Sequence, residues 1–149
     1  VVFQHLGGEV LFADEGDGIL WCMPEWLRGW AREGYFQPVT MVSLMSVTEV
    51  SDADLTHLKG LTGLQRLWLQ DTKVSDAGLV HLERLTALQE LDLSNTQLSD
   101  AGLKHLKGMS SLQRLSLLNT QVSDVGVAGL RAALPSCNIE ARMATVTVP

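Results

Sequence analysis

Three groups of residues in this chain have the side-chain types that catalysis or metal binding uses. The first is Ser75, Asp76 and His81, which has the composition of a nucleophilic triad. On a helix, Asp76 and His81 would lie about 140° apart around the axis and ~7.5 Å apart along it, so they cannot form the hydrogen bond that a triad requires. The same set recurs as Ser51-Asp52 with His57 and as Ser99-Asp100 with His105. We therefore interpret the Ser-Asp pairs, including Ser123-Asp124, as helix N-caps, and we expect no enzyme.

The second group is the histidine column, His57, His81 and His105. Zinc needs each ligating nitrogen at about 2.0–2.1 Å from one point, whereas neighbouring helices pack about 8–10 Å apart. We expect these histidines at the solvent edge of each repeat and predict neither a metal nor a cofactor. A metal-binding protein that uses this column is the remote alternative.

The third group is the acidic stretch Asp14–Gly18, which combines acids with glycines. It lacks the alternating acidic spacing of a calcium loop, so we predict a turn. The chain also has no phosphate-binding loop, no GxSxG and no CxxC.

These residues belong to a repeat whose matching positions, Val50, Val74, Leu98 and Val122, recur every 24 residues. Each period begins with an L-x-x-L-x-L segment, and a period of this length with that segment predicts a leucine-rich repeat. The fold class is therefore α/β: a short right-handed solenoid with a parallel sheet on its concave face and helices on its convex face. We expect a threonine in each repeat to bond backbone groups in the bend after the strand. These threonines are Thr48, Thr72, Thr96 and Thr120.

The chain divides into three segments of one structural domain. Residues 1–38 lack the repeat, and we predict an N-terminal cap of two short strands (8–13 and 19–22) and a helix (about 24–33), because a solenoid must cover its first leucine layer. Residues 39–139 form four repeats and a terminal strand, with one extra residue, and hence a bulge, between Leu44 and Val50. The last helix spans about 124–134. Residues 140–149 form a C-terminal tail, either an edge strand or a linker.

Composition limits the partners that this chain can bind. Its 149 residues carry a formal net charge of −6, which argues against nucleic acids and anionic membranes. No apolar run reaches the ~20 residues of a membrane span, and we expect residues 1–20 not to be a signal peptide, because they lack its basic and apolar regions. We expect Cys22 and Cys137 to be free thiols because they lie at opposite ends of the solenoid, which slightly favours the cytoplasm. The chain begins at Val1, so we expect it to be a piece of a longer protein.

The pattern L-x-x-L-x-L-x-x-T-x-V-[ST]-D-A-G-L-x-x-L occupies residues 64–82, 88–106 and, with departures at Val125 and Val127, 112–130. It resembles the repeats of a bacterial leucine-rich-repeat family that read T-x-V-T-D-A-G-L. The resemblance implies a binding scaffold with no catalytic residues to carry over. It also implies that a membrane-anchoring segment can precede the module in the full-length protein.

The outward-facing residues of the strands form the candidate binding surface. Arg66, Glu90 and Arg114 should form a row of alternating charge across adjacent strands, and Trp68 should lie exposed beside them. Exposed Trp, Met and Arg together are typical of the core of a protein interface. We therefore predict a non-catalytic scaffold that binds a protein or peptide on this face. Self-association, packing against the cap and a purely structural spacer are the alternatives. The predicted binding residues are Met41, Met45, Arg66, Trp68, Gln70, Glu90, Asp92, Ser94, Arg114, Ser116 and Leu118.

Overall fold

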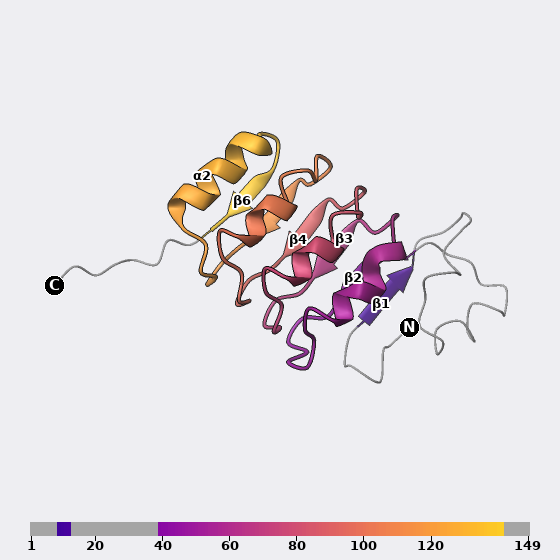
Figure 1. Ribbon diagram of the computed structural model, residues 1–149. Helices are drawn as coiled ribbons and strands as arrows, with labels where there is room; N and C mark the ends of the chain where they lie inside the picture. Colours follow the sequence, from indigo (N-terminus) through magenta and orange to yellow (C-terminus); the bar gives the residue numbers. More distant parts are fainter. Residues whose placement is uncertain (1–8, 13–38, 142–149) are drawn as a thin grey trace, which may run out of the picture.

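The computed structural model describes residues 9–12 and 39–141, which form one six-stranded sheet in the order β1-β2-β3-β4-β5-β6 (Figure 1). The strands are β1 (Glu9–Phe12), β2 (Val39–Ser43), β3 (Arg66–Trp68), β4 (Glu90–Asp92), β5 (Arg114–Ser116) and β6 (Asn138–Glu140). β1 pairs antiparallel with β2, and the other neighbours are parallel. The strand predicted at 8–13 is therefore confirmed, whereas the predicted strand at 19–22 and helix at 24–33 lie outside the described residues.

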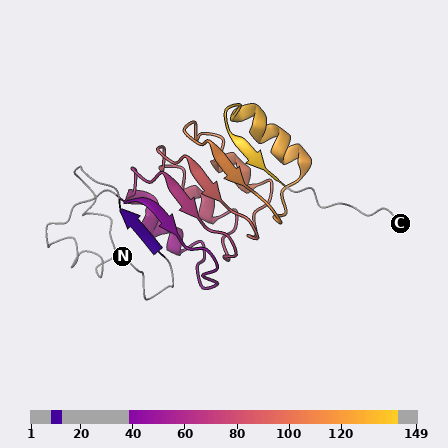
Figure 2. The ribbon, with the colours of Figure 1, turned by 180° about the vertical axis from the view of Figure 1, so that it is seen from behind.

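Four short helices cover one face of this sheet, and the opposite face carries no helix of the described chain (Figures 1 and 2). η1 (Asp54–Gly60), η2 (Gly78–His81) and η3 (Gly102–His105) are 3₁₀ helices, and α2 (Asp124–Ala133) is an α-helix. A 3₁₀ helix rises about 2.0 Å per residue against about 1.5 Å for an α-helix. The segments that connect successive strands therefore cover the length of a strand with fewer residues than an α-helix would need. No helix of the described residues is long and apolar enough to cross a membrane.

The core is a stack of leucine layers between the sheet and the helices. Leu67, Leu91, Leu115 and Ile139 lie in register on successive strands, and all four are buried. In the second repeat, Leu79 of η2, Leu82 at its C-cap and Leu85 after it are fully buried against them. Each repeat thus buries its apolar face only by stacking on its neighbours, which is why the leucine spacing predicted the architecture.

The bend after each strand is held by the predicted threonine. The hydroxyls of Thr72 and Thr96 donate to the carbonyl oxygens of Leu69 and Leu93 at 2.6 Å, and Thr120 makes the same bond at 2.8 Å. Each threonine follows a residue with positive φ, a conformation that Asp and Asn adopt more readily than most residues. These residues are Asp71, Asn95 and Asn119.

The first repeat departs from this pattern. Its positive-φ residue is Ser46, so the position of the threonine is taken by Val47 and not by Thr48, which is exposed. The prediction for Thr48 is therefore wrong. The predicted extra residue in this turn is confirmed, and it shifts Thr48 out of the column.

The prediction that all the Ser-Asp pairs cap helices holds only in part for the first three pairs, because the Ser75 and Ser99 hydroxyls accept from the N–H groups of Ala77 and Ala101 at 3.4 and 3.3 Å but do not occupy the N-cap position. η1, η2 and η3 have alanine at the N-cap and no side-chain cap bond. Instead, each aspartate reaches the serine of the next repeat. The Asp76 carboxylate accepts from the Ser99 N–H at 2.8 Å and from its hydroxyl at 2.6 Å. The pairs Asp52–Ser75 and Asp100–Ser123 are bonded in the same way.

The fourth pair behaves as predicted, because the Ser123 hydroxyl accepts from the N–H of Gly126 and caps α2. Ser123 therefore has two roles: it caps a helix and joins the last two repeats. The same bonds explain the glycine of each repeat, since a Cβ at Gly78, Gly102 or Gly126 would collide with the aspartate of the preceding repeat.

Candidate functional site

The face of the sheet that carries no helix of the described chain, hereafter the open face, presents two rows of side chains that run across the strands. Arg66, Glu90 and Arg114 are paired in register, as predicted. The second row places Trp68 beside Asp92 and Asp92 beside Ser116. Figure 2 shows this face with its strands side by side.

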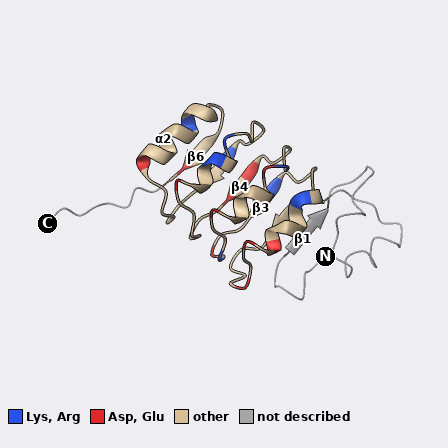
Figure 3. Ribbon diagram, viewed as in Figure 1, with Lys and Arg blue, Asp and Glu red and all other residues tan. Residues whose placement is uncertain are grey.

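The charge row contains one ion pair among the described residues. A guanidinium nitrogen of Arg114 lies 3.4 Å from a carboxylate oxygen of Glu90, and the Arg114 side chain is 73% exposed. A pair this exposed contributes about 0.2–1 kcal/mol to folding. Arg66 is exposed and lies opposite Glu90 on the neighbouring strand, but it forms no ion pair with a described residue. Figure 3 shows that charges of both signs are spread along the solenoid.

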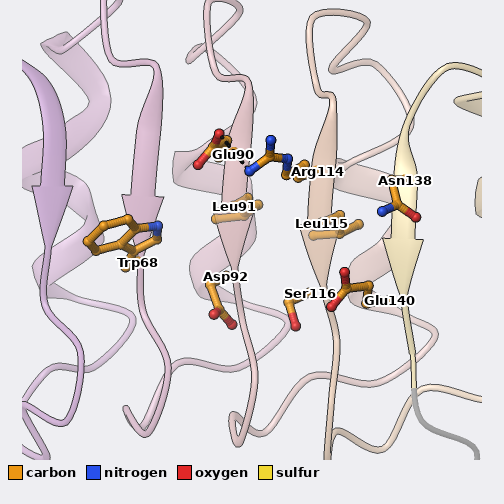
Figure 4. A pocket seen from close by; sticks show the side chains of 9 residues that line it. All are labelled: Trp68, Glu90, Leu91, Asp92, Arg114, Leu115, Ser116, Asn138 and Glu140. Carbon is orange, nitrogen blue, oxygen red and sulfur yellow. Dashed lines mark ion pairs between the residues drawn. The ribbon is translucent and has the colours of Figure 1, made fainter.

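Trp68 is half-buried, and its indole leans from β3 toward β2, with its nitrogen on the β4 side (Figure 4). Ser43, the register partner of Trp68 on β2, is buried. The indole therefore covers part of the sheet and still presents a surface to solvent, as an amphipathic aromatic side chain at an interface does.

Two residues predicted for the exposed face are buried. Met41 is 6% exposed, although it pairs in register with Arg66, which is exposed. Ser94 is 8% exposed. Its N–H donates to Asp92 at 2.9 Å and its hydroxyl bonds that of Ser116 at 2.8 Å, so it supports the face from beneath.

The remaining residues of the third predicted column differ in exposure. Met45 is 45% exposed, whereas Gln70 and Leu118 are half-buried. The Gln70 side-chain oxygen is buried and has no hydrogen-bond partner. The exposed surface of this column is therefore less continuous than we predicted from the sequence.

A shallow hollow of about 140 Å³ lies on the open face over β3 to β6 (Figure 4). It brings together five of the predicted residues with two leucines of the core, and it adds two residues that were not predicted for this face, Asn138 and Glu140. These two follow Arg114 and Ser116 by 24 residues and pair with them in register, so the repeat spacing could have revealed them. The lining residues are Trp68, Glu90, Leu91, Asp92, Arg114, Leu115, Ser116, Asn138 and Glu140.

The histidine column and Cys137 do not line this hollow. His105 Nδ1 lies 2.5 Å from the Glu83 carboxylate, His81 is half-buried and His57 is exposed. No three His, Cys, Asp or Glu residues converge on a metal position within residues 9–12 and 39–141. Cys137 is a half-buried free thiol whose pKa is raised by burial. Cys22 and the stretch Asp14–Gly18 lie outside the described residues.

Comparison with protein families identifies the repeats. The model described as "Leucine Rich repeats (2 copies)" matches residues 62–105 and 86–132. A search of curated proteins finds no match.

Solved structures share the architecture. The actin-binding site 2 of leiomodin-1 aligns with a TM-score of 0.56 at 15% identity, covering 70% of this chain and 71% of that one. Internalin C2 from Listeria monocytogenes aligns at 28% identity with a TM-score of 0.48, covering 66% of this chain. Internalin F from the same organism aligns at 22% identity with a TM-score of 0.44, covering 62% of this chain and 32% of that one. This chain spans 41% of the internalin C2 chain. The stacked leucine layers, the parallel sheet and the matching repeat model together show that residues 62–132 carry leucine-rich repeats and that the described chain folds as a leucine-rich-repeat solenoid.

Proposed function

We propose that this chain is a non-enzymatic interaction module that binds a protein or peptide through the open face. The observation that carries the proposal is the hollow over β3 to β6, where an aromatic ring, an ion pair and further polar groups share one solvent-facing surface. Trp and Arg are the residues most enriched among those that dominate binding energy at interfaces. Here Trp68 would be the anchor, and Arg114, Glu90 and Asp92 would orient the partner.

The size of the face favours a peptide segment or a loop as the part of the partner that binds. Adjacent strands are about 4.8 Å apart, so the four strands around the hollow span roughly 15 Å. Each strand is three residues long, or about 10 Å. This area is well below the ~800 Å² per partner of a standard protein interface, so one extended segment would fill it.

Site-specific photo-cross-linking tests the proposal. A photoreactive residue at Ser116 would lie in the hollow, whereas one at Val125 would lie on α2, where the side chain is 82% exposed. We expect a cross-linked partner from Ser116 and none from Val125, and Arg114→Glu should weaken the cross-link at Ser116. Arg114 is a suitable position because its exposed side chain contributes little to folding. Equal cross-linking from both positions, or a Ser116 signal that Arg114→Glu leaves unchanged, would contradict the proposal.

A structural spacer is the second candidate, and the burial of Met41 and Ser43 favours it. Both residues belong to the outward rows of β2, yet neither is available to a partner. If the rest of the face is covered in the same way in the full-length protein, Ser116 will cross-link only within its own chain.

A further inference from the structure

The hollow on the open face carries an excess of negative charge. Glu90, Asp92 and Glu140 contribute three carboxylates and Arg114 contributes one guanidinium, which leaves a formal charge of −2. Arg114 is paired with Glu90. Within the described part of the chain, neither Asp92 nor Glu140 forms an ion pair, so their charges face solvent without a cation.

Both of these carboxylates are directed at the hollow. Asp92 accepts the N–H of Ser94 at 2.9 Å through one oxygen, which orients the carboxylate and leaves the other oxygen available. Glu140 leans from β6 toward β5, so that its carboxylate lies near Ser116 (Figure 4). The two acids therefore approach the same place from opposite sides of β5.

Trp68 borders this acidic hollow on its third side. It is the register partner of Asp92 on the adjacent strand. Its indole leans toward β2, so Trp68 bounds the hollow beside Asp92, on the side away from Glu140. Arginine suits two carboxylates that flank one strand, because its planar guanidinium carries several N–H donors in a fixed arrangement.

From this arrangement we infer that the hollow holds an arginine side chain of the partner, with its guanidinium over β5, between Asp92 and Glu140. The volume is sufficient: a cavity of about 150 Å³ accepts a molecule of six heavy atoms such as benzene, and a guanidinium has four. The inference rests on the proposed function and names the chemistry that the partner must present.

Three short peptides test this inference by NMR titration of the ¹⁵N-labelled chain. The probes are acetyl-Gly-Arg-Gly-amide, the same peptide with neutral citrulline, and the same peptide with glutamate. We expect the arginine peptide to shift the signals of residues 90–92, 114–116 and 138–140 and of the Trp68 indole. Citrulline, which has nearly the same shape as arginine without its charge, should bind at least about fivefold more weakly.

A charge-matched pair of variants locates the effect. Asp92→Asn with Glu140→Gln should raise the dissociation constant of the arginine peptide about five- to twentyfold, since each exposed ion pair accounts for up to about fivefold. The control is Asp71→Asn with Glu49→Gln, which removes the same charge from two exposed residues outside the hollow. This control should change the constant less than twofold. Equal weakening by both pairs would mean that only net charge matters, and would overturn the inference.

The other outcomes separate this inference from the proposed function. If citrulline or glutamate peptides shift the same face as strongly as arginine does, the face binds peptides but the arginine assignment is wrong. If the arginine peptide shifts no residue of the hollow, the assignment is also wrong. The proposed function is then judged by the cross-linking at Ser116, which does not depend on the charge of the partner.

Discussion

Replacing Gly102 with alanine should destabilise the solenoid, whereas the same replacement at Gly108 in the same repeat should not. A Cβ at Gly102 would collide with the carboxylate of Asp76 and would lie 2.5 Å from Leu98 Cδ1. Leu98 is fully buried, so the adjustment must displace either a core leucine or the aspartate that bonds the next repeat. A Cβ at Gly108 would meet nothing within 4 Å.

The expected loss follows from the two contacts. Overpacking of a filled site costs about 1–3 kcal/mol. Displacing Asp76 also weakens its two hydrogen bonds to Ser99, at 2.8 and 2.6 Å. Bonds to a charged group contribute about 1.5–3 kcal/mol when fully formed, and the half-buried position of Asp76 favours the lower end. We expect Gly102→Ala to lower the free energy of unfolding by about 3 kcal/mol, and Gly108→Ala to change it by less than about 0.5 kcal/mol.

Urea unfolding followed by circular dichroism measures both variants under one condition. A double-mutant cycle with Asp76→Ala then isolates the contact. Once the carboxylate is removed, Gly102→Ala should cost clearly less than it does in the native chain, because only the Leu98 contact remains. Equal stability of the Gly102 and Gly108 variants, or additive effects in the cycle, would refute the role assigned to the Asp–Ser connections between repeats.

Three further outcomes can be checked with single variants. Thr96→Val keeps the side-chain shape but removes the bond from the buried hydroxyl to Leu93 O, so the free energy of unfolding in urea should fall by about 1 kcal/mol. Gly129→Ala, whose Cβ would meet nothing within 4 Å in α2, should raise the melting temperature, because alanine is favoured over glycine in a helix by about 1 kcal/mol. The Ser123 hydroxyl and then its N–H lower the pKa of Asp100 below 3.8. The stabilisation from Asp100 is therefore complete above the ordinary pKa and is lost as the pH falls through the lowered value. An NMR titration of the Ser123→Ala variant should show the pKa of Asp100 moved back toward 3.8, and no movement would contradict the cause assigned here.

The residues of the open face were predicted from the 24-residue spacing, and their register is as expected. Arg66, Glu90 and Arg114 lie side by side because residues at equal repeat positions must stack when strands are parallel and in register. The same spacing extends to Asn138 and Glu140, which the sequence analysis assigned to the terminal strand and the tail without placing them on the face. Their inclusion is what makes the hollow acidic.

Burial on the face could not be predicted from spacing. Met41 and Ser94 occupy outward positions, and both are buried. Met41 is buried although its register partner Arg66 is exposed, and its strand pairs with β1, which lies 26 residues earlier in the chain. Ser94 is held by Asp92 and Ser116. Exposure depends on what packs beside a residue, and a repeat pattern carries no information about neighbours that do not repeat.

The sequence by itself determined the repeat, the leucine core, the parallel strands and the threonine that closes the bend in three of the four repeats, because these follow from local periodicity and from the need to bury apolar side chains. The tertiary structure decided the role of the Ser-Asp pairs. The sequence of one repeat predicts that Asp76 belongs to a helix cap. Only the stacking of repeats places its carboxylate within hydrogen-bonding distance of Ser99, 23 residues away. The same stacking explains why Gly102 must lack a side chain. Residues of successive repeats meet only when the repeats stack. The sequence shows which residue types recur, but only the fold shows which residue of the next repeat each one contacts.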